Sequence, residues 1–211
     1  MLLALFLLAQ GADSIPIRAF DRPPAPSASI DSVVLGNPSV RIPMAQGTAF
    51  VWLLRASDTV LVAASIPDST PSWRDDFVLS LDTHGDGGPR PQHDDFQWDL
   101  RRMLDSSVIY RGRNGRWEPP RDDPDWRIGP ERSGGGWEVA ASSTPSRWTL
   151  LLRLDPAWFP GNGSAPVRMA LRIYDASANA WYSWPPALGR APATTIEESP
   201  ALWLRVYESR T

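Results

Sequence analysis

Apolar and polar residues alternate in short runs along most of this chain, a period-two pattern that predicts strands rather than helices. The clearest runs are Ala49–Arg55 and Thr59–Ile66, which only three residues separate. So short a connection predicts that the two runs form a β-hairpin. The run Val167–Tyr174 alternates equally well, with its bulky apolar side chains on one face of the predicted strand.

Turn-forming residues bound the other strand-like runs. These are Val33–Leu35, Val40–Ile42, Phe77–Leu81, Val108–Tyr110, Gly136–Ala140, Trp148–Leu154 and Ala201–Tyr207. A single helical turn is predicted at Asp155-Pro156, with Asp155 as N-cap and Pro156 in the first position. Many short strands and almost no helix predict an all-β fold, an antiparallel two-sheet β-sandwich of jelly-roll or immunoglobulin-like type with about ten strands.

The amino-terminal residues predict an exported protein. Met1–Ala9 is an unbroken apolar run that is too short to span a bilayer. It resembles the apolar region of a secretory signal, although the usual positively charged start is missing; a short buried strand or helix is the alternative. We therefore divide the chain into a signal-like segment (1–11), a proline-rich extended lead-in (12–29) and one domain (30–211). We expect a secreted or periplasmic monomer with no stable membrane span after signal removal.

Composition narrows the classes of function. The chain has 211 residues, 42% of them hydrophobic, and a net charge of −3. This is enough for one core, and it lacks the basic excess that nucleic acid or an anionic membrane attracts. With no cysteine and only the two histidines His84 and His93, disulfides, thiolate sites and a three-histidine zinc site are excluded. Eleven tryptophans exceed what such a core needs, so some are expected at the surface, where indole is a typical ligand platform.

Four stretches resemble the family 9 carbohydrate-binding modules and the wider DOMON-like superfamily. They are the hairpin Phe50–Ile66 with Pro67-Asp68; Trp73-Arg74-Asp75-Asp76 followed by Phe77–Asp82; the aromatic segment Phe96-Gln97-Trp98 after a glycine loop; and Trp137-Glu138 with Trp148–Leu154 and Asp155–Trp158. The resemblance implies a β-sandwich, and it favours a strand over a helix at Phe96–Leu100, where the pattern alone fits both. The chain departs from the family's pattern at the turn after Leu154 and in the loop 111–135.

The resemblance also implies a site in which two tryptophans hold a sugar ring. Sugar C–H faces stack on indole while flanking polar groups bind the hydroxyls. Trp73 is the expected wall on one side, and Trp181 or Trp184 the wall from a late loop. The expected hydroxyl partners are Asn179, Gln97 and Arg101. The alternative is that Trp73 and Trp184 cap the core at the ends of the sandwich.

The loop that begins at Asp82 partly imitates an EF-hand. Asp82 and Asp86 occupy positions one and five and a glycine follows at six, but His84 and His93 stand at positions three and twelve. Asp94 and Asp95 follow at once. A structural calcium held by Asp82, Asp86, Asp94 and Asp95 is one interpretation, and a solvated β-turn is the other.

The remaining acidic residues offer weaker hypotheses. Of Asp75 and Asp76, the one that points inward needs a partner, for which an arginine is favoured over sugar or metal. A glycosidase pair drawn from Asp94, Asp95, Glu118 and Glu138 would require a defined separation, which the sequence does not contain. Haem ligation is disfavoured because both histidines lie in polar segments. The sequence therefore predicts a non-catalytic carbohydrate-binding domain that binds a glycan or cell-envelope polysaccharide. The alternative is a structural or partner-binding envelope domain with no sugar site.

Overall fold

A computed structural model describes residues 14–19, 35–56, 58–104, 107–119, 137–159, 166–186 and 199–209. The strands are β1 (Ser14–Ala19), β2 (Val40–Met44), β3 (Gly47–Arg55), β4 (Val60–Pro67), β5 (Asp76–Asp82), β6 (Asp95–Arg101), β7 (Val108–Arg113), β8 (Arg116–Glu118), β9 (Trp137–Ser143), β10 (Arg147–Leu154), β11 (Arg168–Asp175), β12 (Ala180–Trp184) and β13 (Leu204–Ser209). Two 3₁₀ turns, η2 (Pro156–Trp158) and η4 (Pro200–Leu202), interrupt them. Within the described ranges, no helix is long and apolar enough to cross a membrane.

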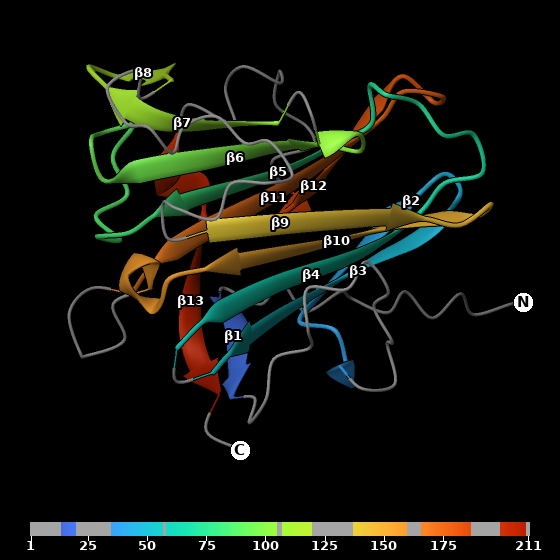
Figure 1. Cartoon of the computed structure of the whole chain (residues 1–211). Helices are drawn as coiled ribbons and strands as arrows, with labels where there is room; N and C mark the ends of the chain where they lie inside the picture. Colours follow the sequence, from blue (N-terminus) through green and yellow to red (C-terminus); the bar gives the residue numbers. More distant parts are fainter. Residues whose placement is uncertain are drawn as a thin grey trace, which may run out of the picture.

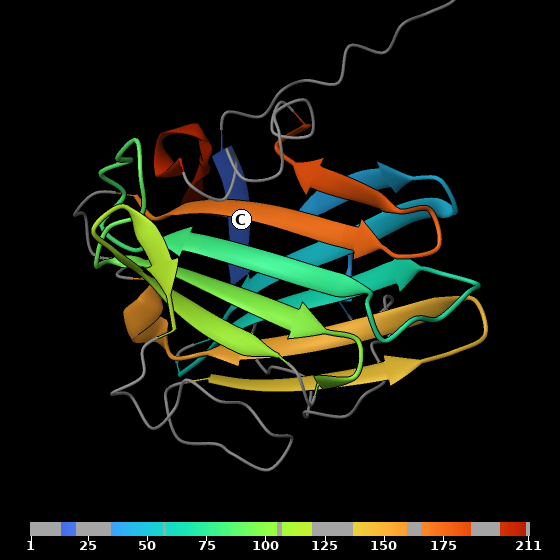
Figure 2. The same cartoon turned by 90° about the horizontal axis from the view of Figure 1, so that it is seen from above.

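The strands form two layers that face each other (Figures 1 and 2). One layer runs β8-β7-β6-β5-β11, with β12 on the free edge of β11; the other runs β3-β4-β10-β9, with β2 on β3. Strands β13 and β1 join the layers at one side, so the hydrogen-bonded path is continuous. The predicted β-sandwich is confirmed, with thirteen strands in place of about ten.

The core fills the space between the two layers. Its largest contributions come from alternate residues of β5, such as Phe77 and Leu79, and from Leu53, Leu152 and Leu171 on β3, β10 and β11. Each of these five side chains is fully buried. The period-two pattern of the sequence has therefore placed one face of each strand in the core and left the other face free for other roles.

The predicted hairpin exists as β3 and β4, with Phe50 opposite Ser65 and Arg55 opposite Val60. The strand reading of Phe96–Leu100 is also right, since this segment forms most of β6. The helical turn forms as η2, where the Asp155 carboxylate accepts the Ala157 N–H at 2.8 Å.

Three segments differ from the sequence expectation. Ser14–Ala19, assigned to an extended lead-in, is a strand that pairs in parallel with both β13 and β3, so the sheet is not purely antiparallel. Ala180–Trp184, expected as a loop, is strand β12. The start of the expected loop 111–135 is a short β7–β8 hairpin. The signal-like segment, the rest of the lead-in and residues 120–136 lie outside the described residues.

Candidate functional site

A row of polar and aromatic side chains crosses the outer face of the first layer. Arg101 on β6 pairs with Asp76 on β5, Asp76 with Tyr174 on β11, and Tyr174 with Trp181 on β12. Directly paired residues point to the same side of a sheet. Asp76 has the parity opposite to the core residue Phe77, so the whole row lies on the face away from the core.

An ion pair orders the first half of this row. The Nη1 atom of Arg101 lies 2.7 Å from Oδ2 of Asp76, and Nη2 lies 3.6 Å from Oδ2 of Asp99. Asp76 is buried whereas Arg101 keeps part of its side chain exposed. Burial raises the pKa of the Asp99 carboxyl, and the nearby Arg101 charge opposes that shift. Arg101 thus presents a fixed guanidinium edge beside two carboxylates, a mixed donor and acceptor set without a strong net charge.

Trp181 forms the other half of the row. The Arg172 guanidinium carbon lies 3.9 Å from the centroid of the indole ring, so one face of the ring is taken by a cation–π contact. Tyr174 contacts the same indole at a centroid distance of 5.0 Å. The Tyr174 hydroxyl donates to the Asn179 side-chain oxygen at 2.8 Å. Trp181 is partly exposed and Asn179 fully so, which makes them accessible to a ligand.

The turn that carries Asn179 is built tightly. Asn179 has a φ of 46°, in the left-handed region that asparagine tolerates better than most residues. The Asp175 carboxylate accepts the N–H groups of Ser177 and Ala178 at 2.9 and 3.0 Å. The short polar side chains of this turn therefore fix the position of Asn179 relative to Trp181.

The loop that carries Trp73 is joined to this turn. Trp73 is 65% exposed, more than any other large hydrophobic residue among those described. Two residues later, the Asp75 carboxylate accepts the Ala176 N–H at 3.0 Å and the Ser72 N–H at 2.7 Å. Trp73 and Asn179 thus belong to adjoining segments at one end of the first layer.

A buried arginine supports both segments from below. Arg102 pairs with Asp68 and, at 3.3 Å, with Asp75, and all three side chains are almost fully buried. The Arg102 backbone N–H donates to the Asp75 carbonyl at 3.0 Å. The expected arginine partner of Asp75 is therefore Arg102, and that of Asp76 is Arg101. Burial raises the pKa of the Asp75 carboxyl, and two backbone N–H donors oppose the shift.

The structure separates two of the sequence candidates from this row. Gln97 lies on the same face as Arg101 but four residues earlier, about 13 Å along the strand. It is buried, and its amide donates to the Ser80 hydroxyl at 3.2 Å. Trp184 pairs with the core residue Leu171 and packs against the core. Of the two late tryptophans, Trp181 is the one on the outer face.

Sequence reasoning missed Tyr174 and Arg172 as parts of this row. Both alternate with core residues along β11, which marks them as outward-facing. Their proximity to Trp181 depends on the β11–β12 pairing, which no local pattern indicated.

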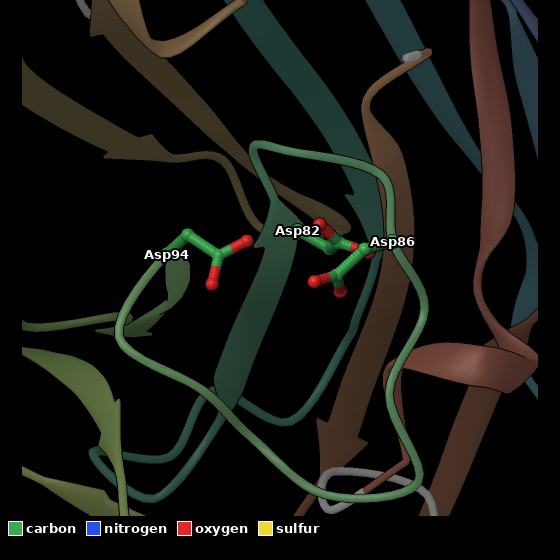
Figure 3. A group of neighbouring side chains, drawn as sticks. All are labelled: Asp82, Asp86 and Asp94. Atoms are coloured by element: carbon green, nitrogen blue, oxygen red, sulfur yellow. The ribbon is translucent and has the colours of Figure 1, made fainter.

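A second cluster lies between β5 and β6, where three carboxylates converge. Ligand oxygens of Asp82, Asp86 and Asp94 lie within 4.8 Å of one another. Figure 3 shows Asp94 approaching from the side opposite Asp82 and Asp86. Oxygen ligands of one Ca²⁺ at 2.3–2.6 Å are at most about 5 Å apart, so this spacing fits a calcium ion. Asp95, the fourth predicted ligand, pairs directly with Asp82 across the two strands.

The electrostatics of this cluster also fit a cation. Burial raises the pKa of the Asp82 carboxyl and raises that of Asp95 to about 8, and neighbouring carboxylates push both in the same direction. Asp94 Oδ2 and Asp95 Oδ1 are buried without a hydrogen-bond partner. Asp82 itself accepts N–H groups from Gly85 and Gly87. A divalent ion would relieve the repulsion and supply the missing partner.

Comparison with known proteins identifies the fold. No family model matches the sequence, and no curated protein matches it. Among solved structures, the chain is similar to a family 9 carbohydrate-binding module from Caldicellulosiruptor kristjanssonii in complex with glucose, with a TM-score of 0.58 and 14% identity over 93% of this chain and 97% of that one. The same kind of module in complex with cellotriose gives a TM-score of 0.57 and 13% identity over 92% and 95% of the two chains. The chain therefore has the fold of the family 9 carbohydrate-binding modules, as its sequence resemblance implied.

Proposed function

We propose that this chain is a non-catalytic glycan-binding domain, and that its ligand binds at the row formed by Trp181, Tyr174, Asp76 and Arg101. The observation that carries the proposal is the row itself. It places an accessible indole, an exposed amide at Asn179 and an arginine–carboxylate pair on one face of a rigid sheet. An aromatic face beside convergent polar groups suits a sugar ring, whose C–H face is apolar and whose rim is hydroxylated.

Trp73 supplies the opposing wall in this proposal. Its indole is largely exposed, and its loop is hydrogen-bonded to the turn that carries Asn179. Because Arg172 already occupies one face of Trp181, a sugar stacks on the remaining face. The related fold in complexes with glucose and cellotriose supports a β-glucan or similar neutral glycan as the first ligand to test.

The test is calorimetric titration with glucose, cellotriose and a panel of envelope polysaccharides, followed in parallel by tryptophan fluorescence. Trp181→Ala and Trp73→Ala are each expected to weaken binding at least about tenfold, since aromatic stacking in a desolvated site contributes 1 kcal/mol or more. Tyr207→Ala is the matched control, because Tyr207 is an exposed aromatic outside the row. No binding to any glycan, or equal binding by all three variants, overturns the proposal and leaves a structural or partner-binding role.

A structural calcium at Asp82, Asp86 and Asp94, with Asp95 beside them, is a second proposal. Its support is the convergence of the three carboxylates and the two buried, unpartnered oxygens. Calorimetric titration of chelator-treated protein with CaCl₂ tests it, and Asp82→Asn is expected to abolish the binding. Export rests on the apolar run Met1–Ala9. Cell fractionation with amino-terminal sequencing tests it, and size-exclusion chromatography tests the monomer.

A further inference from the structure

The two histidines of the chain lie side by side against one buried carboxylate. His84 and His93 come from opposite ends of the β5–β6 connection, and their ring centroids are 6.1 Å apart at an interplanar angle of 81°. Nδ1 of His84 lies 3.3 Å from Oδ2 of Asp94, and Nδ1 of His93 lies 3.6 Å from Oδ1 of the same residue. Asp94 is 4% exposed, whereas the two imidazoles are 65% and 74% exposed.

These contacts are too long to satisfy Asp94 by hydrogen bonding. Charge-assisted hydrogen bonds between nitrogen and a carboxylate are about 2.7–2.9 Å long. Asp94 Oδ2 has no hydrogen-bond partner among the described residues although it is buried. A buried carboxylate oxygen without a partner is costly, so something that is not part of the polypeptide is the expected partner.

The spacing fits ligands around a tetrahedral metal ion. With bonds of 2.0–2.1 Å to Zn²⁺, neighbouring ligand atoms are about 3.3–3.4 Å apart. The distances of 3.3 and 3.6 Å between Asp94 and the two imidazoles lie close to that value. Both histidines are exposed enough for their side chains to rotate about the fixed carboxylate, and water can supply a fourth ligand.

We propose that His84, His93 and Asp94 bind a borderline divalent cation, of which Zn²⁺ is the type case, at a site separate from the carboxylate cluster. Imidazole nitrogen suits Zn²⁺, Cu²⁺ or Ni²⁺, whereas Ca²⁺ takes oxygen ligands. Asp94 belongs to both donor sets, and its two oxygens allow it to face an ion on either side. This inference goes beyond glycan binding and does not depend on it.

The experiment uses tag-free full-length protein, because a histidine tag would itself bind the probe. Calcium-saturated protein is titrated with ZnCl₂ by calorimetry, and with CoCl₂ while the visible d–d absorption of tetrahedral Co²⁺ is recorded. His84→Ala and His93→Ala are each expected to weaken Zn²⁺ binding by more than about tenfold, because loss of even an outer-shell partner of a metal costs 10–100-fold. Both variants should keep their calcium affinity. Gln92→Ala, an exposed neutral position in the same loop, is the matched control.

Asp82→Asn separates this site from the carboxylate cluster. It is expected to leave Zn²⁺ binding within about threefold of wild type, because Asp82 is not in contact with either imidazole. Three results overturn the proposal. They are an absence of Zn²⁺ binding, equal Zn²⁺ binding by wild type and both histidine variants, and a loss in Asp82→Asn as large as that in His84→Ala.

Discussion

Replacing Arg102 by methionine tests whether the buried ion cluster supports the end of the sandwich that carries Trp73 and Asn179. Methionine keeps the length and apolar stem of the side chain but removes the guanidinium. The change leaves Asp68 and Asp75 buried without their arginine. Breaking a buried pair from one side costs about 3–5 kcal/mol, because the remaining charge is uncompensated.

The partners that remain decide where in that range the cost falls. Asp75 keeps the N–H groups of Ser72 and Ala176, and Asp68 keeps that of Thr70 at 2.8 Å. These donors soften the loss, so we expect the free energy of unfolding to fall by about 3 kcal/mol at neutral pH. Burial already raises the pKa of Asp75. Protonation on acidification therefore neutralises the stranded charge, and the loss should shrink near pH 5.

The assay is urea denaturation followed by tryptophan fluorescence, with the m-value compared between variants. Arg74→Met is the matched control, since Arg74 is an exposed arginine in the same loop. Its effect should stay within about 0.5 kcal/mol. A loss below about 1 kcal/mol for Arg102→Met at neutral pH refutes the reasoning, as does a loss that is the same near pH 5.

Three other changes probe the row, the carboxylate cluster and the core. Tyr174→Phe removes the hydrogen bond to Asn179 and should weaken glucose binding by about 2–10-fold in calorimetry, while unchanged affinity would show that Asn179 is held by its backbone alone. In chelator-treated protein the folded state holds protons on Asp82 and Asp95 that the unfolded state has released. The free energy of unfolding should therefore fall between about pH 4 and the Asp95 pKa of about 8, and Asp95→Asn should flatten that slope in urea titrations at several pH values. Leu79→Ala, at a fully buried position, should cost about 2–5 kcal/mol in the same assay, and a smaller loss would mean that the core collapses around the cavity.

The parts of the fold that could be predicted are those with one buried and one free face. Strands β3, β4, β10 and β11 carry long apolar alternations because each packs one side against the core. The parts that were missed lack that signal. All five residues of β12 are half-buried, β8 has only three residues, and β1 pairs in parallel with segments far away in sequence. Local periodicity contains no information about such distant pairing.

The candidate site was predictable by residue type but not by position. The family resemblance suggested Arg101, Gln97 and Asn179 as hydroxyl partners, and Arg101 and Asn179 do lie beside Trp181 or in its row. Gln97 shares the face of Arg101 yet lies two rows away. Alternation along a strand gives the face of a residue, whereas its row depends on how neighbouring strands are registered.

Register also decides which late tryptophan reaches the surface. Trp181 and Trp184 are three residues apart, so their side chains point to opposite faces of β12. The four-residue turn 176–179 sets the pairing of Trp181 with Tyr174 and of Trp184 with Leu171. A slip of one residue would exchange the two faces and bury Trp181. The Asp175 carboxylate and the left-handed Asn179 hold that turn. The polar turn residues therefore determine which indole is available to a ligand, although they contribute nothing to the core.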